Sequence, residues 1–147
     1  MTTPPDVWQL EHFVDVDASQ AFVWAWRTDI TTWDDPPARF ALDGPFADGA
    51  HGTTSLPGQT PLTWTLRDVR APETFTVEMP LDRAALLFEW RLGALGDRRT
   101  RLSQRIGVEG ENAAAYVDQV RSGFGATMAD GMLRLAGALE EAARSEP

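Results

Sequence analysis

The chain of 147 residues contains no cysteine and no lysine, and its 13 basic residues are all arginine. It therefore cannot form disulfides, thiolate metal sites, thiol nucleophiles or lysine Schiff bases. Histidine occurs only twice and tyrosine once. An active site in this chain has to be built from histidine, arginine, carboxylates, hydroxyls and amides.

Long apolar runs and basic clusters are also scarce. No segment approaches the roughly 18 apolar residues of a membrane helix, and residues 1–6 lack the positive charge and apolar stretch of a signal peptide. The net charge is −9 and the pI about 4.6, which disfavours nucleic acid and anionic membrane surfaces as partners. We expect one cytoplasmic domain over residues 1–147, with its core between about 8 and 144.

Signatures of cofactor sites are missing as well. The sequence has no Gly-x-Ser-x-Gly elbow, phosphate loop or dinucleotide fingerprint, and two distant histidines without cysteine make no zinc pattern. We expect neither a cofactor nor a metal. Both a monomer and a homodimer remain open.

Seven segments have the composition of strands, most of them through strict alternation of apolar and polar residues. They are residues 8–17, 39–43, 51–56, 61–69, 74–79, 85–92 and 100–109. Successive strands separated by turn signals predict an antiparallel sheet with one buried face.

Two helices are predicted around this sheet. Asp17 and Gln20 have the spacing of a capping box, and the helix they open ends at Asp34-Asp-Pro-Pro37, which reads as a solvated helix end because proline cannot continue a helix. A long helix is predicted from about 112 to 144, because apolar residues recur there at helical spacing. Its four glycines (123, 125, 131 and 137) could reflect close packing, a bend around Phe124 or room for a bound molecule, and close packing is the favoured explanation.

The order of these elements, together with certain local sequences, resembles the START-like superfamily. This is the polyketide cyclase/dehydrase and lipid-transport family, which shares the fold of birch-pollen allergens. The similarity is most specific in the segment 14–24, which ends in Val23-Trp24, and in Thr28-Asp29 and Trp33. The resemblance implies an α+β helix-grip fold, in which a curved antiparallel sheet wraps around a long C-terminal α-helix and encloses a cavity.

One position departs from the family pattern. Arg27 stands where such proteins usually have an apolar residue, so the helix face that meets the cavity stays open. Periodicity favours the face of Phe22, Trp26 and Ile30, whereas the family pattern favours Val23 and Trp24. An inward Arg27 could neutralise a carboxylate or polarise a carbonyl. We expect its side chain to extend to solvent instead.

Most of the expected cavity wall follows from the strand alternation. Large aromatic side chains and flexible thioethers provide an adaptable apolar surface, although each of them could equally be ordinary core. The candidate ligand-binding residues are His12, Trp26, Trp64, Phe75, Met79, Phe88, Trp90, Gln104, Phe124 and Met128.

Three functions remain open on this evidence. Few polar residues point inward, which favours a binding or carrier protein for a hydrophobic or aromatic small molecule. The alternative is a polyketide aromatase/cyclase or dehydratase-like enzyme, in which His12 is the candidate acid–base and Gln104 or Arg27 polarises a carbonyl. The third hypothesis is a module that binds and modulates another protein. His51, near a turn, is expected to be exposed.

Overall fold

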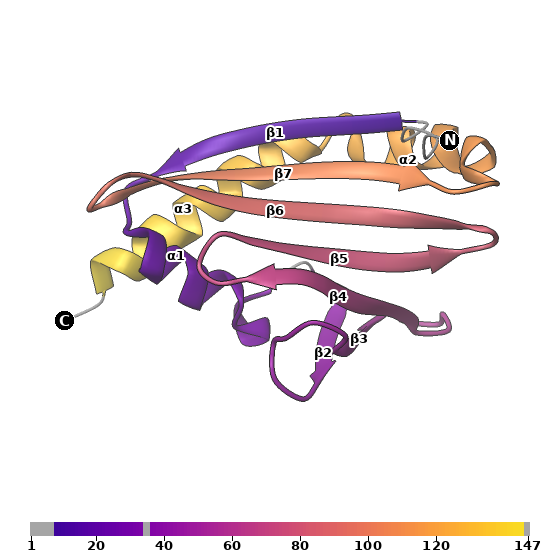
Figure 1. Ribbon diagram of the computed structural model, residues 1–147, viewed down its shortest axis with the longest axis horizontal. Coiled ribbons are helices and arrows are strands. Elements are labelled where there is room, and N and C mark those ends of the chain that lie inside the picture. Colours follow the sequence, from indigo (N-terminus) through magenta and orange to yellow (C-terminus); the bar gives the residue numbers. More distant parts are fainter. Residues whose placement is uncertain (1–7, 34–35, 146–147) are drawn as a thin grey trace.

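The computed structural model describes residues 8–33 and 36–145, which form one curved antiparallel sheet covered by helices. The seven strands follow the order β1-β7-β6-β5-β4-β3-β2 (Figure 1). They are β1 (Trp8–Val16), β2 (Arg39–Asp43), β3 (His51–Ser55), β4 (Leu62–Arg70), β5 (Thr74–Leu81), β6 (Ala84–Gly96) and β7 (Arg99–Glu109). All seven predicted strands are present, with boundaries that shift by a few residues.

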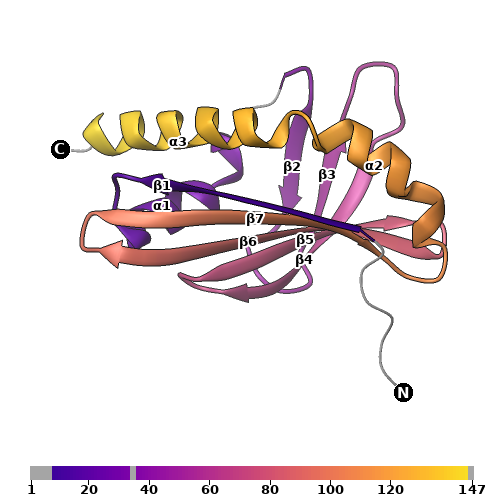
Figure 2. The same ribbon diagram turned by 90° about the horizontal axis from the view of Figure 1, so that it is seen from above.

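The helices lie together on one face of this sheet (Figure 2). They are α1 (Gln20–Arg27), the short 3-10 helices η1 (Ile30–Thr32) and η2 (Ala113–Tyr116), α2 (Val117–Phe124) and α3 (Met128–Ser145). Helix α3 packs against β1, and α1 contacts β6, β7 and α3. The apolar core lies between the two layers, so the predicted α+β helix-grip arrangement is confirmed.

The first helix begins and ends differently from the prediction. Ser19, not Asp17, caps α1, because its Oγ accepts a hydrogen bond of 3.1 Å from the Phe22 amide. The helix ends at Arg27, and Asp29 caps the separate η1. The predicted end at Asp34 and Asp35 lies outside the described residues. This early end leaves Trp33 on a segment that can turn back toward the sheet.

The predicted C-terminal helix is divided into α2 and α3. The Gly125 amide donates to the Arg121 carbonyl at 2.7 Å and closes α2. A Cβ added at Gly123 or Gly137 would meet nothing within 4 Å. Close packing, the favoured explanation for these glycines, is therefore wrong at both positions, whereas the bend beside Phe124 is present.

In the sheet, Gly52 has a steric role. It is the cross-strand partner of Trp64, and a Cβ at Gly52 would overlap the indole ring. The ring has no free space in which to move, because Trp64 is 1% exposed and its Nε1 donates to Thr54 Oγ1 at 3.0 Å. Only glycine allows the ring to lie flat over β3.

These two environments predict opposite effects of the same substitution. Gly137→Ala is expected to raise the free energy of unfolding by about 0.5–1 kcal/mol. The reason is that Gly137 is exposed within a helix, where alanine has a higher helix propensity than glycine. Gly52→Ala is expected to lower it by about 1–3 kcal/mol, because the buried ring has to shift. Chemical denaturation of both variants measures the difference. Equal effects at the two sites would contradict this account.

Candidate functional site

The strand register aligns four predicted site residues in a row across the inner face of the sheet. His12 of β1 pairs with Gln104 of β7, Gln104 pairs with Trp90 of β6, and Trp90 pairs with Phe75 of β5. Cross-strand partners on one face have Cβ atoms about 5 Å apart. The row therefore changes from polar to aromatic over three strand spacings.

An aromatic cluster of seven residues surrounds the Phe75 end of this row. Trp33 stacks on Trp64 with ring centroids 5.5 Å apart, and Phe75 stacks on Trp90 at 6.1 Å. Edge-to-face contacts join these stacks to each other and to the first helix. The members of the aromatic cluster are Trp24, Trp33, Phe40, Phe46, Trp64, Phe75 and Trp90.

A cation lies inside this aromatic cluster. The Cζ of Arg27 is 4.2 Å from the ring centroid of Trp90 and 5.0 Å from that of Trp33. Trp33 Nε1 also donates to the Arg27 carbonyl at 2.8 Å, which fixes the ring beside the end of α1. Both indoles thus stabilise the guanidinium through their π-faces.

The Arg27 guanidinium has no hydrogen-bonding partner among the described residues. The residue as a whole is half-buried, but its Nε is fully enclosed and unpaired. Burial lowers the pKa of Arg27 to about 10, so the group still carries its charge at neutral pH. The interior of this protein therefore contains a positive charge that nothing in the described chain neutralises.

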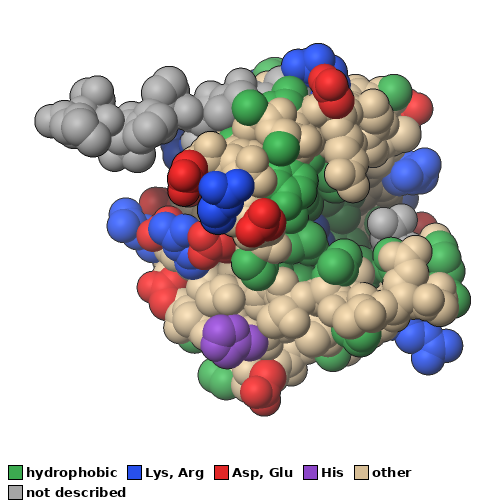
Figure 3. All heavy atoms as spheres, turned by 90° about the vertical axis from the view of Figure 1, so that its right-hand side faces the viewer, with side chains coloured by type: hydrophobic (Ala, Val, Ile, Leu, Met, Phe, Trp, Pro, Cys, Tyr) green, Lys and Arg blue, Asp and Glu red, His purple; other side chains and the backbone are tan. Residues whose placement is uncertain are grey.

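Where α2 ends, an aromatic side chain of the sheet contacts one of the helix. Phe88 of β6 meets Phe124, the last residue of α2, edge to face at 5.4 Å. Both rings remain partly exposed, as does Met79 of β5. The space-filling view from the side of the molecule where α2 lies shows a hollow with hydrophobic side chains in it (Figure 3).

The ten predicted site residues fall into two groups by exposure. Trp64, Phe75, Trp90 and Met128 are buried and pack as core. The others are only partly buried: His12, Trp26, Met79, Phe88, Gln104 and Phe124. His51, predicted to be exposed, is exposed. Whether any of the ten binds a ligand stays a prediction.

The prediction that Arg27 extends to solvent is wrong. Val23 is fully buried, and Arg27 lies one helical turn later on the same face of α1. Val23, the buried residue of α1, lies on the face that the family pattern favours. The other residue of that pattern, Trp24, is partly buried, as are Phe22, Trp26 and Ile30. Two features of the sequence could have indicated that Arg27 points inward. It stands four residues after Val23, and the family pattern has an apolar residue at this position.

His12 and Gln104 are polar groups without partners on the inner face. Neither side chain forms a hydrogen bond with another described residue, and both are partly buried. Their strand neighbours are apolar: Val14, Leu102 and Ile106 belong to the core, and Leu10 packs against it. The two side chains can therefore accept or donate hydrogen bonds to a molecule bound there.

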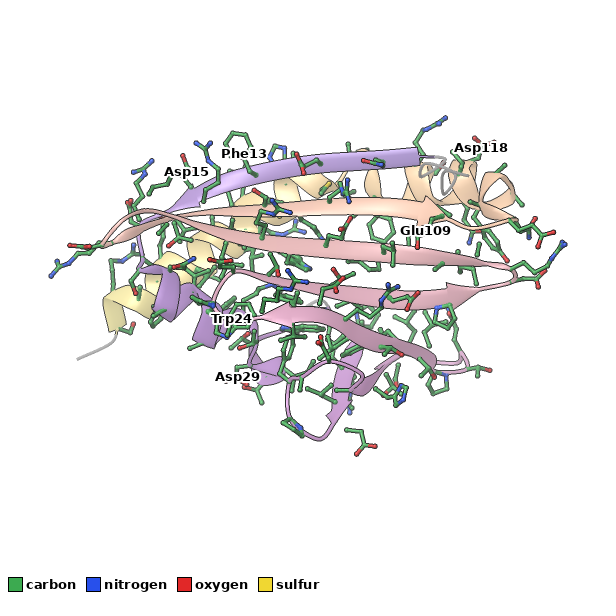
Figure 4. All side chains as sticks on the ribbon, in the orientation of Figure 1. Phe13, Asp15, Trp24, Asp29, Glu109 and Asp118 are labelled. Atoms are coloured by element: carbon green, nitrogen blue, oxygen red, sulfur yellow. The ribbon has the colours of Figure 1, made fainter. Side chains whose placement is uncertain are left out.

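The outer face of the sheet carries a different, polar depression of about 520 Å³. Two of its lining residues form an ion pair, in which Arg105 Nε lies 2.6 Å from Glu89 Oε2. Beside the depression, Arg67 lies 2.9 Å from Glu78. Arg101 of β7 contacts two residues of β1, the Phe13 ring at 4.2 Å and Asp15 at 2.8 Å, both labelled in Figure 4. These arginines have counter-ions, unlike Arg27.

Two other kinds of site are absent from the described part of the chain. Its histidines and carboxylates form no group of three or more that could hold a metal ion. None of its helices combines the length and the apolar character needed to cross a membrane.

Comparison with known proteins identifies the fold. No protein-family model matches the sequence, and no curated protein matches it either. Solved structures do match: the Zhui aromatase/cyclase from Streptomyces sp. R1128 has a TM-score of 0.70 and 18% identity, over 94% of this chain and 96% of that one. The chain has the START-like, or helix-grip, fold.

Two further START-like structures extend this likeness. Norcoclaurine synthase from Thalictrum flavum, solved with dopamine and hydroxybenzaldehyde, has a TM-score of 0.62 and 16% identity, over 87% of this chain and 85% of that one. A protein from Arthrobacter aurescens has a TM-score of 0.68 and 19% identity, over 95% and 91%. At these identities the comparison establishes the fold, and the function has to be argued from the site.

The unpaired guanidinium gives a prediction about stability. Arg27→Met is expected to leave the free energy of unfolding of the ligand-free protein unchanged, or to raise it by up to about 2 kcal/mol. The reason is that methionine fills similar apolar space without the desolvation cost of a buried charge, which the two cation–π contacts offset only in part. Urea denaturation measures the change. A loss of more than about 1 kcal/mol would show that Arg27 is a structural residue.

Proposed function

We propose that this protein binds a hydrophobic or aromatic small molecule between the inner face of the sheet and the helices α2 and α3. The observation that carries the proposal is the exposed aromatic surface of Phe88 and Phe124, which meet edge to face between the sheet and α2. The hollow with hydrophobic side chains on the α2 side of the molecule supports it (Figure 3). Exposed aromatic surface in a concave site is favourable for a ligand because its burial removes apolar area from water.

The distribution of polar groups supports a ligand with a polar end. Partly buried His12 and Gln104 lie on neighbouring strands, and Arg27 lies over Trp90 beside them. A few convergent polar groups in an apolar wall are typical of small-molecule sites. The names of two structural neighbours, an aromatase/cyclase and a synthase solved with two aromatic compounds, agree with an aromatic ligand.

A protein-docking role has less support. The exposed large hydrophobic side chains of the described chain are Phe13, Leu62, Leu95 and Leu133. They come from four different elements, β1, β4, β6 and α3, rather than from one continuous segment. A docking surface needs a contiguous apolar patch, so we place this function third.

Ligand binding is tested by shortening the aromatic side chains of Phe88 and Phe124. Phe88→Ala and Phe124→Ala are each expected to weaken the binding of aromatic ligands about tenfold or more, because each removes a ring that the ligand would contact. Phe13→Ala is the matched control, since Phe13 is 50% exposed on the outer face. Isothermal titration calorimetry with ligands found by a thermal-shift screen measures the effect. Equal losses in all three variants would contradict the proposed place of binding.

A second candidate function is catalysis of the aromatase/cyclase type, favoured by the unpartnered His12 and Gln104 on paired strands. A histidine at this place can move a proton while an amide orients the substrate carbonyl. His12→Ala is then expected to lower the turnover of a linear poly-β-keto thioester at least about a hundredfold, with little change in its binding. Product analysis by mass spectrometry measures turnover, and an unchanged rate would remove His12 from the mechanism.

A further inference from the structure

Among the described residues, the side chain of Arg27 has an enclosed nitrogen atom that lacks a hydrogen-bond partner. This atom is Nε, and the Cζ of the same side chain lies over the rings of Trp90 and Trp33. We propose that Arg27 binds the carboxylate of the hydrophobic ligand, so that the ligand is an aromatic or aliphatic carboxylic acid rather than a neutral molecule. This inference rests on the proposed function, because it assigns the polar end of the same ligand.

The surroundings of the guanidinium leave it in need of an acceptor. An indole has a donor N–H but no hydrogen-bond acceptor, so Trp33 and Trp90 attract the charge without satisfying its N–H groups. No described carboxylate forms an ion pair with Arg27, whereas Arg67, Arg99, Arg101 and Arg105 all have one. A charge that is partly removed from water is stabilised by an opposite charge that arrives with its own hydrogen-bond acceptors.

The chemistry of the site favours a carboxylate over other anions. A carboxylate is planar and carries a single charge, and its two oxygens match two parallel N–H donors of a guanidinium. A phosphate would bring up to two charges into an enclosure formed by indole rings, with one arginine to neutralise them. Gln104, the cross-strand neighbour of Trp90, offers amide N–H groups to the same end of the ligand.

The strand geometry also sets the approximate length of the ligand. Phe88 and Trp90 are two positions apart on β6 and share its inner face, which places their Cα atoms about 7 Å apart. A carboxylate at Arg27 therefore leaves the apolar part of the ligand beside Phe88 and Phe124. A fused pair of aromatic rings or an acyl chain of similar length spans this distance.

The test compares an acid with its neutral analogue. The probes are naphthoate and naphthamide, which share the same ring system but differ in charge, with dissociation constants measured by calorimetry. The native protein is expected to prefer naphthoate by about tenfold to a hundredfold, the usual contribution of hydrogen bonds to a charged group. In Arg27→Met this preference disappears, while the affinity for naphthamide stays within about threefold.

Two variants and a spectroscopic measurement act as controls. Arg101→Met removes another arginine that contacts an aromatic ring, but on the outer face and with Asp15 as its partner, so the preference for the acid is expected to persist. Arg27→Lys keeps the charge but loses the paired N–H donors of the guanidinium. An intermediate preference for naphthoate over naphthamide is therefore expected. In a nitrogen–proton NMR spectrum, the Arg27 Nε–H signal, identified by its absence in Arg27→Met, is expected to shift with naphthoate and not with naphthamide.

Each contrary result has a distinct meaning. If the native protein binds naphthoate and naphthamide equally, the assignment of Arg27 is overturned while the proposed function stands. If neither probe nor their aliphatic counterparts, dodecanoate and dodecanamide, bind at all, both are overturned. If Arg27→Met destabilises the ligand-free protein and Asp34→Asn with Asp35→Asn does the same, the counter-ion belongs to the chain itself and the proposal is overturned.

Discussion

The interaction on which the rest of this structure depends is the packing of aromatic rings between the first helix and the sheet. Trp33 follows the short helix η1 and stacks on Trp64 of β4, while its indole N–H holds the carbonyl at the end of α1. The aromatic cluster thereby joins β2, β4, β5 and β6 to α1 and η1. Glycine at position 52 is the local condition for this packing, since it leaves space for the Trp64 ring.

The same rings determine where charge can reside. The protein has a net charge of −9, and its described carboxylates lie mainly on exposed surface or in ion pairs. At physiological ionic strength, exposed charges are screened beyond about 8 Å, so they do little to compensate the enclosed Arg27. The indole faces of Trp33 and Trp90 supply the nearest stabilisation. An acidic protein can in this way keep an interior that attracts anions.

Much of the fold follows from the sequence because strand alternation and turn residues act locally. The pattern predicts every strand, and the residues of the segment 14–24 indicate the family fold. Periodicity could not decide the depth of Arg27, because a terminal arginine on a helix usually reaches water, and only the tertiary position of Trp90 and Trp33 encloses it. The sequence also did not show that the helix breaks at Gly125. A glycine destabilises a helix by about the same energy whether it stands at a bend or at a close packing contact.

The strand order has a consequence for how the chain reaches this structure. Among the described strands, β1 comes first in the sequence, lies at an edge of the sheet and pairs only with β7, the last of them. The ion pair between Asp15 and Arg101 joins residues 86 positions apart. Closing so large a loop is entropically costly, and chains rich in such distant contacts fold in milliseconds to seconds rather than microseconds. During synthesis, the first strand therefore remains without its partner until nearly the whole sheet has been made.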